Sequence, residues 1–204
     1  SVVIPAFNSE RFIAEAIQSV LAQTYLPIEI IVVDDGSSDD TEYVVRRIMT
    51  AGPIAYYRRE NQGPSAARNF GVSQARGDWV AFLDADDVWY SEKLTIQADH
   101  IQASPNAALF FSEMDYVDEV GQLMPPIDWR DELAPLMFNH QTPLFPSTVI
   151  LRKDVFVKAG GFNPMLRSHE DAELFARIAA SYRIHYIGRS LVKYRCHPTQ
   201  LHRD

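Results

Sequence analysis

Three aspartates follow a short apolar run in the stretch GDWVAFLDADD, residues 77–87. Asp84, Asp86 and Asp87 are so close in the chain that their carboxylates repel one another unless solvent or a cation balances the charge. While the chain stays extended, Asp84 and Asp86 point to one side and Asp87 points away. Carboxylate oxygens suit Mg²⁺ or Mn²⁺, which bind through one or two carboxylates plus substrate phosphates. The motif is therefore either a solvated acidic turn or a metal site.

A second acidic pair, Asp34-Asp35, follows the apolar run IEIIVV and begins the segment DDGSSDDT. Aspartate, serine and glycine in this pattern are typical of a turn that leads into a helix N-cap. Alternatively, one of the two carboxylates accepts a hydrogen bond from a base, since it can take the ring N–H of uracil, which cytosine lacks. Both interpretations stay open from the residues alone.

The pair Glu170-Asp171 in SHEDAELF begins an amphipathic stretch. Ser168 could cap that helix, which would place Asp171 at the third helical position, where an acid commonly has a structural role. The alternative is a general base held at the helix N-terminus and facing a cleft. Adjacent helical residues diverge by about 100°, so only one of the two carboxylates can face such a cleft.

Three other side chains could contribute to such a site. His197, in YRCHPTQ, is either a surface or packed histidine or a nitrogen ligand for an ion like Mn²⁺. Arg68, in GPSAARNFG, is either a solvated helix residue or a partner for nucleotide oxygens. Trp129 falls in a stretch rich in proline and aromatics, residues 115–146, that we expect to form a long loop or a lid. An aromatic ring there could stack on a sugar.

The bulk composition is that of a folded domain with an acidic balance. The 204 residues are 47% hydrophobic and 23% charged, and 19 basic against 27 acidic side chains give a formal net charge of −8. This balance argues against a nucleic-acid partner, which normally requires a basic face. Cys196 is the only cysteine of the sequence, which argues against a disulfide framework or a cysteine-based zinc cluster.

The sequence contains no apolar run long enough to span a membrane, and its single cysteine favours a reducing, cytoplasmic location. The chain begins directly on a strand-like segment and ends without a cap, which suggests a fragment of a longer protein. Segments outside it could hold the protein at the inner face of the membrane.

Strand and helix patterns alternate along the first half of the chain. The runs SVVI, IEIIVV, IAYY and WVAFL predict strands, and residues 12–21 (capped by Asn8 or Ser9), 41–49 and 65–75 predict helices between them. Later segments predict helices at 91–102 and 170–180 and strands at 108–112, 147–152 and 191–195. This order predicts an α/β fold with a mostly parallel central sheet flanked by helices.

In such sheets, ligands bind beyond the carboxyl ends of the strands. Three predicted strands end in the segments PAFN (5–8), DDGS (34–37) and DADD (84–87), and parallel pairing would bring these ends to one edge. The sequence has neither G-x-G-x-x-G after its first strand nor G-x-x-x-x-G-K-[ST], which argues against a dinucleotide oxidoreductase and a P-loop NTPase. Phosphates bound at this edge would need a metal to balance much of their charge.

The motifs SVVIPAFN, QTY, EIIVVDDGSSDDT, NQGPSAARNFG, GDWVAFLDADD, GGF and HEDAELFARI occur in the order seen in family 2 glycosyltransferases of the GT-A fold. The chain resembles that family over nearly its whole length, most densely in residues 1–87. The resemblance implies one Rossmann-like GT-A catalytic domain over residues 1–204. Its nucleotide-binding half would be 1–87 and its acceptor-binding and catalytic half 88–204.

The resemblance also implies roles for individual residues. The nucleotide-binding set would be Pro5, Ala6, Phe7, Asp34, Asp35, Arg68, Asp84 and Ala85. Within it, Asp35, or alternatively Asp34, would recognise the base, and Asp84 would lie by the ribose. Asp86 would coordinate Mn²⁺ or Mg²⁺ under the diphosphate, and His197 would complete the metal shell. The pair Glu170-Asp171 would contain the catalytic base, with Asp171 the better candidate.

These roles imply metal-dependent, inverting transfer of a sugar from a nucleotide-diphosphate donor, most commonly a UDP-sugar. The acceptor would be a hydroxyl of a glycan or a lipid-linked molecule in polysaccharide or cell-envelope synthesis. Two other interpretations remain. One is a non-catalytic subunit that binds sugar nucleotides. The other is an aspartate-nucleophile phosphatase, because LDADDV also satisfies its D-x-D-x-[TV] pattern; that motif should end the first strand of its domain, whereas two strand–helix units precede it here.

Overall fold

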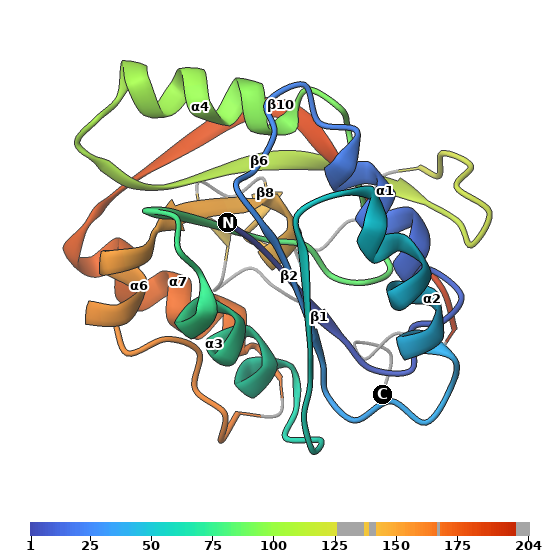
Figure 1. The fold of residues 1–204 in the computed structure, drawn as a ribbon. Helices are drawn as coiled ribbons and strands as arrows, with labels where there is room; N and C mark the ends of the chain where they lie inside the picture. Colours follow the sequence, from blue (N-terminus) through green and yellow to red (C-terminus); the bar gives the residue numbers. More distant parts are fainter. Residues whose placement is uncertain (126–136, 139–141, 167, 199–204) are drawn as a thin grey trace.

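A computed structural model of the chain (Figure 1) describes residues 1–125, 137–138, 142–166 and 168–198. Eight strands form one sheet in the order β3-β2-β1-β4-β9-β6-β10-β5. Their bounds are β1 Val2–Ala6, β2 Ile30–Asp34, β3 Ile54–Arg58, β4 Trp79–Phe82, β5 Val88–Trp89, β6 Ala107–Val117, β9 Val149–Arg152 and β10 Arg183–Arg195. A separate pair is formed by β7 (Met137–Phe138) and β8 (Thr142–Pro143).

Most strands of the large sheet run in one direction. β1 pairs in parallel with β2 and β4, and β2 pairs in parallel with β3. β9 is antiparallel to both β4 and β6, so β6 runs in the same direction as β4. Its neighbour β10 is parallel to it. The carboxyl ends of β1, β2, β4 and β6 therefore lie on one edge, and the predicted α/β fold with a mostly parallel sheet is confirmed.

Helices cover both faces of the sheet, as Figure 1 shows. One face carries α1 (Ile13–Leu21), α2 (Thr41–Ile48) and α4 (Lys93–Ala103), and the other carries α3 (Pro64–Gln74), α6 (Lys153–Lys158) and α7 (Glu170–Ser181). Short 3-10 helices η1 (Met49–Ala51) and η3 (Pro146–Thr148) complete the described elements.

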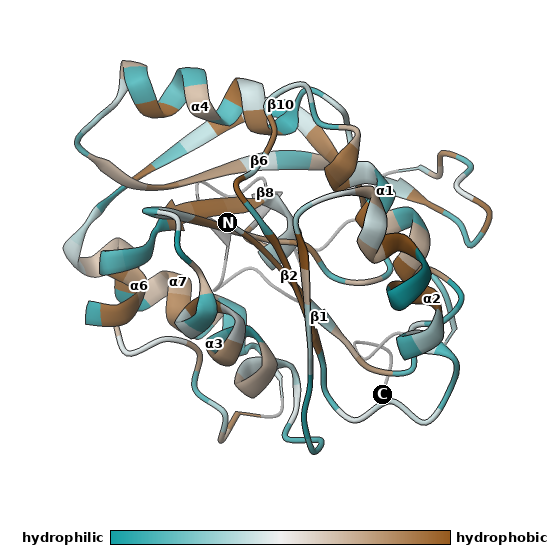
Figure 2. Ribbon diagram, in the orientation of Figure 1, coloured by the Kyte–Doolittle hydropathy of each residue, from teal (hydrophilic) through white to brown (hydrophobic). Residues whose placement is uncertain are grey.

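The central strands are buried on both faces, which explains their unbroken apolar sequences. In β1, Val2 and Ile4 pack with α1 and α2, whereas Val3 packs with α3 on the opposite face. Figure 2 shows the same arrangement, with hydrophobic residues along β1 and β2 and mixed hydropathy on the helices around them. Continuous apolar runs therefore form the middle layer of a three-layer core.

A glycine sets the position of α3 against the sheet. A Cβ atom at Gly71 would lie 2.3 Å from Cγ1 of Val3 and 3.3 Å from Cγ2 of Val33. Only glycine allows the helix backbone to approach β1 and β2 this closely. The approach matters for the site because α3 carries Arg68, about one helical turn after its first residue, Pro64.

The predicted helix and strand order is confirmed, with differences at the ends. Neither Asn8 nor Ser9 caps the first helix, because turns intervene and α1 begins at Ile13 with Phe12 as its N-cap. Asn8 instead adopts a left-handed conformation (φ 47°), and its Oδ1 accepts a hydrogen bond from the Ser38 amide at 2.8 Å.

The short elements β5 and α6 were not predicted, since two and six residues are too few for a periodic pattern. Of the expected loop at 115–146, residues 115–117 continue β6, and residues 126–136 and 139–141, with Trp129 among them, lie outside the described residues. Within the described part of the chain, none of the helices has the length and apolar character needed to cross a membrane.

Candidate active site

The loop that follows β4 holds its three aspartates in different environments. Asp87 is 1% exposed, and its carboxylate accepts hydrogen bonds from Ser147 Oγ at 2.5 Å and from the Arg195 amide at 3.0 Å. Burial, and then the negative charges of Asp86 and Asp84, raise the pKa of Asp87 well above its ordinary value. Asp87 therefore fixes the loop from inside, as expected for the residue that points away from the other two.

Asp86 faces a histidine from the end of the chain. Its Oδ2 lies 2.9 Å from Nε2 of His197, and the side chains of the two residues are 26% and 8% exposed. Two ligands bound at right angles to one ion, each at about 2.1 Å, lie about 3.0 Å apart. The two atoms are within hydrogen-bond distance of each other, and their spacing also fits adjacent positions in one metal shell. The described residues contain no group of three or more His, Cys, Asp or Glu side chains that could hold a metal by themselves.

The three carboxylates of this loop also act on Tyr194 in β10. Burial, and then the charges of Asp87, Asp86 and Asp84, raise the pKa of the nearby Tyr194 hydroxyl above its ordinary value. A phenol resists ionisation where neighbouring carboxylates remain charged. A cation bound at this loop would offset the negative charges of its carboxylates.

Arg68 connects this loop to α7. Its Nη2 lies 2.7 Å from Oδ1 of Asp84, and its Nη1 lies 3.0 Å from Oε1 of Glu170. The guanidinium is 7% exposed and lies over the ring of Phe162, 5.3 Å from its centroid. Burial by itself lowers the pKa of Arg68, but the charges of Asp84 and Glu170 outweigh it and raise the pKa. Arg68 was expected at nucleotide oxygens; here its two Nη groups hold protein carboxylates, and nucleotide contact stays a prediction.

The two adjacent acids at the start of α7, Glu170 and Asp171, have different environments. Ser168 does not cap this helix; α7 begins at Glu170, and its N-cap is His169 in a left-handed conformation (φ 59°). Glu170 is 7% exposed and turns inward to Arg68. Asp171, the second helical residue, is partly exposed and accepts a hydrogen bond from the Ala172 amide at 2.7 Å. Of the pair, Asp171 is the more exposed carboxylate, and it lies at the positive end of the helix dipole.

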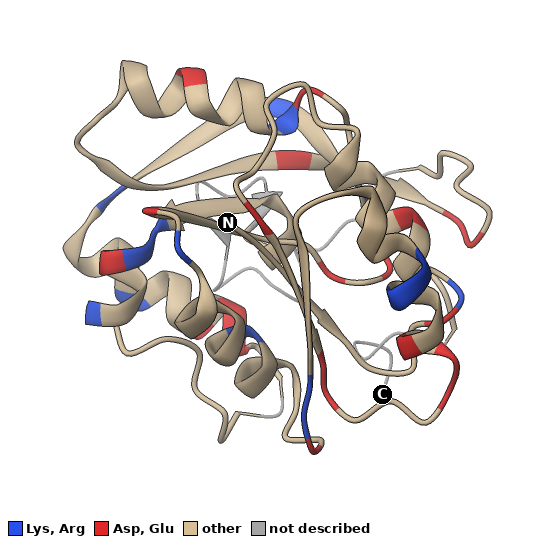
Figure 3. Cartoon of the chain, viewed as in Figure 1, with Lys and Arg blue, Asp and Glu red and all other residues tan. Residues whose placement is uncertain are grey.

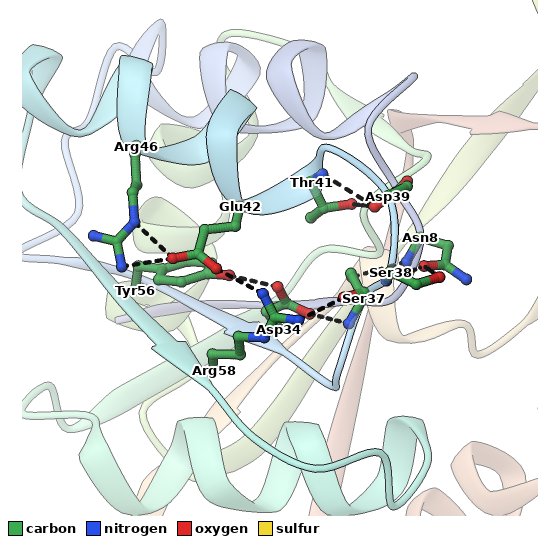
Figure 4. A network of polar contacts seen from close by, with 10 residues as sticks. All are labelled: Asn8, Asp34, Ser37, Ser38, Asp39, Thr41, Glu42, Arg46, Tyr56 and Arg58. Atoms are coloured by element: carbon green, nitrogen blue, oxygen red, sulfur yellow. Dashed lines mark hydrogen bonds and ion pairs between the residues drawn. The ribbon is translucent and has the colours of Figure 1, made fainter.

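The loop after β2 is organised by Asp34 (Figure 4). Asp34 is fully buried: its Oδ1 accepts the Ser37 amide at 2.7 Å, and its Oδ2 accepts the hydroxyl of Tyr56. Burial, followed by the hydrogen bond and charge of Asp34, raises the pKa of Tyr56. Both oxygens of Asp34 are therefore occupied by structural partners, and the choice between Asp34 and Asp35 for contact with a base stays a prediction.

Asp35 joins two loops at the same edge. Its carboxylate accepts hydrogen bonds from the amides of Gln62, at 3.0 Å, and Gly63, at 2.7 Å. Gly63 has a φ of 89°, a conformation that glycine adopts without strain, and it immediately precedes α3. Asp35 thus aligns the end of β2 with the start of the helix that carries Arg68.

The end of β1 lies beside this pair of loops. The Ala6 carbonyl accepts the Asp35 amide at 2.8 Å, and Pro5 is paired with Val33 in the sheet. Phe7 is 51% exposed, unusual for a large aromatic residue next to a buried strand. Ala85 in the DADD loop, by contrast, is only 7% exposed.

The structure therefore brings most of the predicted residues to one edge of the sheet. Figure 3 shows acidic residues directly at the end of β2 and in the loops on that side of the sheet. Sequence reasoning missed Ser147 and Arg195, both of which contact the DADD loop. Arg195 had a weak signal, because it lies two residues before His197. No sequence motif connects Ser147 with the DADD loop, because Ser147 lies 60 residues from Asp87.

Comparison with known proteins identifies the fold and then the family. The S. aureus protein TarS, residues 1–349, crystallised in complex with UDP, superposes with a TM-score of 0.78 and 27% identity over 97% of this chain and 60% of that one. The fold is the GT-A fold of glycosyltransferases. The model of glycosyl transferase family 2 matches residues 1–171. The chain belongs to glycosyl transferase family 2.

Curated relatives agree with this assignment. An uncharacterized glycosyltransferase of Rickettsia felis is 33% identical over 200 residues, which cover 96% of this chain and 32% of the relative. The Escherichia coli protein WfaP, a UDP-Glc:α-D-GlcNAc-diphosphoundecaprenol β-1,3-glucosyltransferase, is 35% identical over 119 residues, 58% of this chain and 46% of WfaP. The chain thus spans about a third of the length of the Rickettsia felis relative.

Proposed function

We propose that this domain transfers a sugar from a nucleotide-diphosphate donor to an acceptor hydroxyl, with inversion at the anomeric carbon. One observation carries the proposal: Arg68 joins the loop of Asp84 and Asp86 to the α7 N-terminus of Glu170 and Asp171. A place for a leaving diphosphate and a place for a general base are thereby held together at one edge of the sheet. Membership of a glycosyltransferase family supports the assignment of this chemistry.

On the donor side, Asp86 and His197 would hold a divalent cation, Mn²⁺ or Mg²⁺. When bound, such an ion stabilises the negative charge that develops on the diphosphate as the glycosidic bond breaks. The fit rests on the 2.9 Å spacing of a carboxylate oxygen and an imidazole nitrogen. Asp84, already paired with Arg68, would lie toward the ribose rather than complete the metal shell.

On the acceptor side, Asp171 would act as the general base. A carboxylate can remove the proton of the incoming hydroxyl as that oxygen attacks the face opposite the diphosphate. Glu170 cannot serve equally well, because its carboxylate is buried against Arg68. A single displacement of this kind inverts the configuration of the anomeric carbon.

The donor we favour is a UDP-sugar. Asp35 would recognise its base, and the nucleotide pocket would be lined by Pro5, Ala6, Phe7 and Ala85. TarS was crystallised with UDP, and WfaP uses UDP-glucose and an acceptor carried on diphosphoundecaprenol, which supports this choice. We propose a glycan or lipid-linked acceptor and action in the cytoplasm, next to the membrane that carries such an acceptor.

The test is thermal unfolding of the chain with UDP, GDP, dTDP and CDP, each with Mn²⁺ and with EDTA. A ligand at about 100 times its dissociation constant adds roughly 2.7 kcal/mol of stability. For a domain of this size, that corresponds to a melting shift of about 5–11 °C. We expect a shift of this size with UDP that requires Mn²⁺. No shift with any of the four nucleotides, in either condition, would contradict the proposal.

The phosphatase interpretation has no comparable support. It requires Asp84 to be a nucleophile at the end of the first strand, but Asp84 follows β4, and its Oδ1 is paired with Arg68 at 2.7 Å. Release of phosphate from a simple phosphoester such as p-nitrophenyl phosphate would favour it instead.

A further inference from the structure

Arg195, the last residue of β10, has the environment of a positioning residue for the proposed metal pair. It is 2% exposed, and it is one of the largest fully buried side chains in the described part of the chain. Its charge is balanced at Nη2, which lies 2.6 Å from Oε2 of Glu15 on α1. A buried arginine whose partner carboxylate is itself 56% exposed gains little from that ion pair alone, so its other contacts must explain its place.

Those other contacts hold the DADD loop from two directions. Arg195 Nε donates to the main-chain carbonyl of Asp86 at 2.8 Å. The Arg195 amide donates to Oδ1 of Asp87 at 3.0 Å. Two consecutive residues of the loop are therefore tied to one residue of β10, and the main chain that carries the Asp86 carboxylate is fixed on both sides.

The same arginine also fixes the position of His197. The guanidinium of Arg195 lies 4.9 Å from the centroid of the Phe12 ring, and the His197 ring lies 5.0 Å from that centroid. The chain between them stays attached to the sheet, because the Cys196 amide donates to the Val117 carbonyl at 2.8 Å. Arg195 and His197 therefore both pack against one aromatic ring.

A third contact extends to the segment beyond β6. Arg195 Nη1 donates to the carbonyls of Glu119, at 3.1 Å, and Asp118, at 3.4 Å. The three nitrogens of the guanidinium thus make hydrogen bonds in three directions: to the DADD loop, to this segment and to α1. Such a pattern needs the planar fork of arginine, since the single ammonium of a lysine cannot reach all three.

We propose that Arg195 is a positioning residue that keeps Asp86 and His197 at ligand spacing. This inference rests on the proposed function, because it concerns the metal pair of that site. Partners outside the ligand shell orient the ligands, and their loss typically weakens metal affinity about 10- to 100-fold. Arg195→Lys keeps the charge and removes the fork, so we expect Mn²⁺ affinity in the presence of UDP to fall about 10-fold.

The experiment is a Mn²⁺ titration of the chain with saturating UDP, followed by the EPR signal of free Mn²⁺. Arg177→Lys is the matched control. Arg177 makes the same kinds of contact, to the carbonyls of Ala159 and Gly161 and to Glu173, but lies two turns along α7 from Asp171. We expect Arg177→Lys to lower the melting temperature without changing Mn²⁺ affinity, and Arg195→Lys to change both. UDP affinity in EDTA should be equal in all three proteins.

Glu15→Ala provides a second variant should Arg195→Lys fail to fold. It removes the exposed carboxylate that balances the charge of Arg195, so the buried guanidinium should shift from the DADD loop, and Mn²⁺ affinity should fall, by less than the 10-fold loss expected for removal of the fork. Mn²⁺ affinity equal to wild type in both foldable variants would overturn the positioning role. Absence of UDP-dependent Mn²⁺ binding in the wild-type chain would instead contradict the proposed function itself.

Discussion

Replacement of Arg68 by methionine should destabilise the fold more than any ordinary surface change. Arg68→Met keeps a long apolar side chain over Phe162 but removes both ion pairs, to Asp84 and to Glu170. Removing one partner of a buried ion pair costs about 3–5 kcal/mol, because the remaining charge stays buried without compensation.

The two carboxylates will not contribute equally to that cost. The Asp84 side chain is 27% exposed and can regain water, whereas the Glu170 side chain is 9% exposed and cannot. We therefore expect the lower end of the range, a loss of about 3 kcal/mol, mostly from Glu170. For a domain of this size, the melting temperature should fall by about 6–12 °C.

Urea unfolding at neutral pH, followed by tryptophan fluorescence, measures this loss. The matched variant is Arg68→Met with Glu170→Met, which removes both buried charges. Because replacing both partners by apolar groups can be nearly neutral, the double variant should recover at least half of the stability lost in the single one. A single variant within about 1 kcal/mol of wild type, or a double variant no better than the single, would refute the assignment of Arg68 as a buried charge bridge.

Three further predictions concern other parts of the molecule. Burial lowers the pKa of Lys93 well below its ordinary value of 10.5. At pH values between the folded and the unfolded pKa, the unfolded chain therefore binds more protons than the folded one. Stability should rise toward pH 10, by up to about 1.4 kcal/mol per pH unit, in urea titrations of wild type, and more weakly in Lys93→Met. Gly71→Ala should cost about 1–3 kcal/mol in thermal unfolding, because its Cβ would meet Val3 at 2.3 Å; an unchanged melting temperature would show that α3 can shift outward. Asp86→Ala should bind UDP equally with Mn²⁺ and with EDTA by calorimetry, whereas full Mn²⁺ dependence in that variant would remove Asp86 from the metal site.

The sequence predicted the layers of the fold because its signals are local. Runs such as IIVV in β2 are apolar throughout since both faces of that strand are covered, and this periodicity is readable without a structure. The edge that carries the site followed from the parallel pairing of β1, β2 and β4. Caps were predicted less well: Ser168 has the right residue type, but the chain turns at His169 in a left-handed conformation instead.

The contacts that organise the site could not be predicted, because they join residues distant in sequence. Arg68 is 102 residues from Glu170, and Arg195 is 180 residues from Glu15. The residue pattern allowed two interpretations of Arg68, solvated helix surface or nucleotide contact, and none of Arg195; only the fold shows that both are buried. The likeness to a family supplied the expected roles of Asp86, Asp171 and His197, and those roles stay predictions.

The most direct test of the account is nucleotide-sugar turnover by Asp171→Asn. Wild type and variant would be incubated with UDP-glucose or UDP-N-acetylglucosamine and Mn²⁺, with a lipid-linked GlcNAc acceptor, and release of UDP would be measured beside UDP affinity. General base catalysis contributes about 10²- to 10⁴-fold to rate. We predict that Asp171→Asn binds UDP as tightly as wild type and loses at least about 100-fold in acceptor-dependent UDP release. Wild-type turnover in that variant would contradict the assignment of Asp171 as the base and, with it, the central claim.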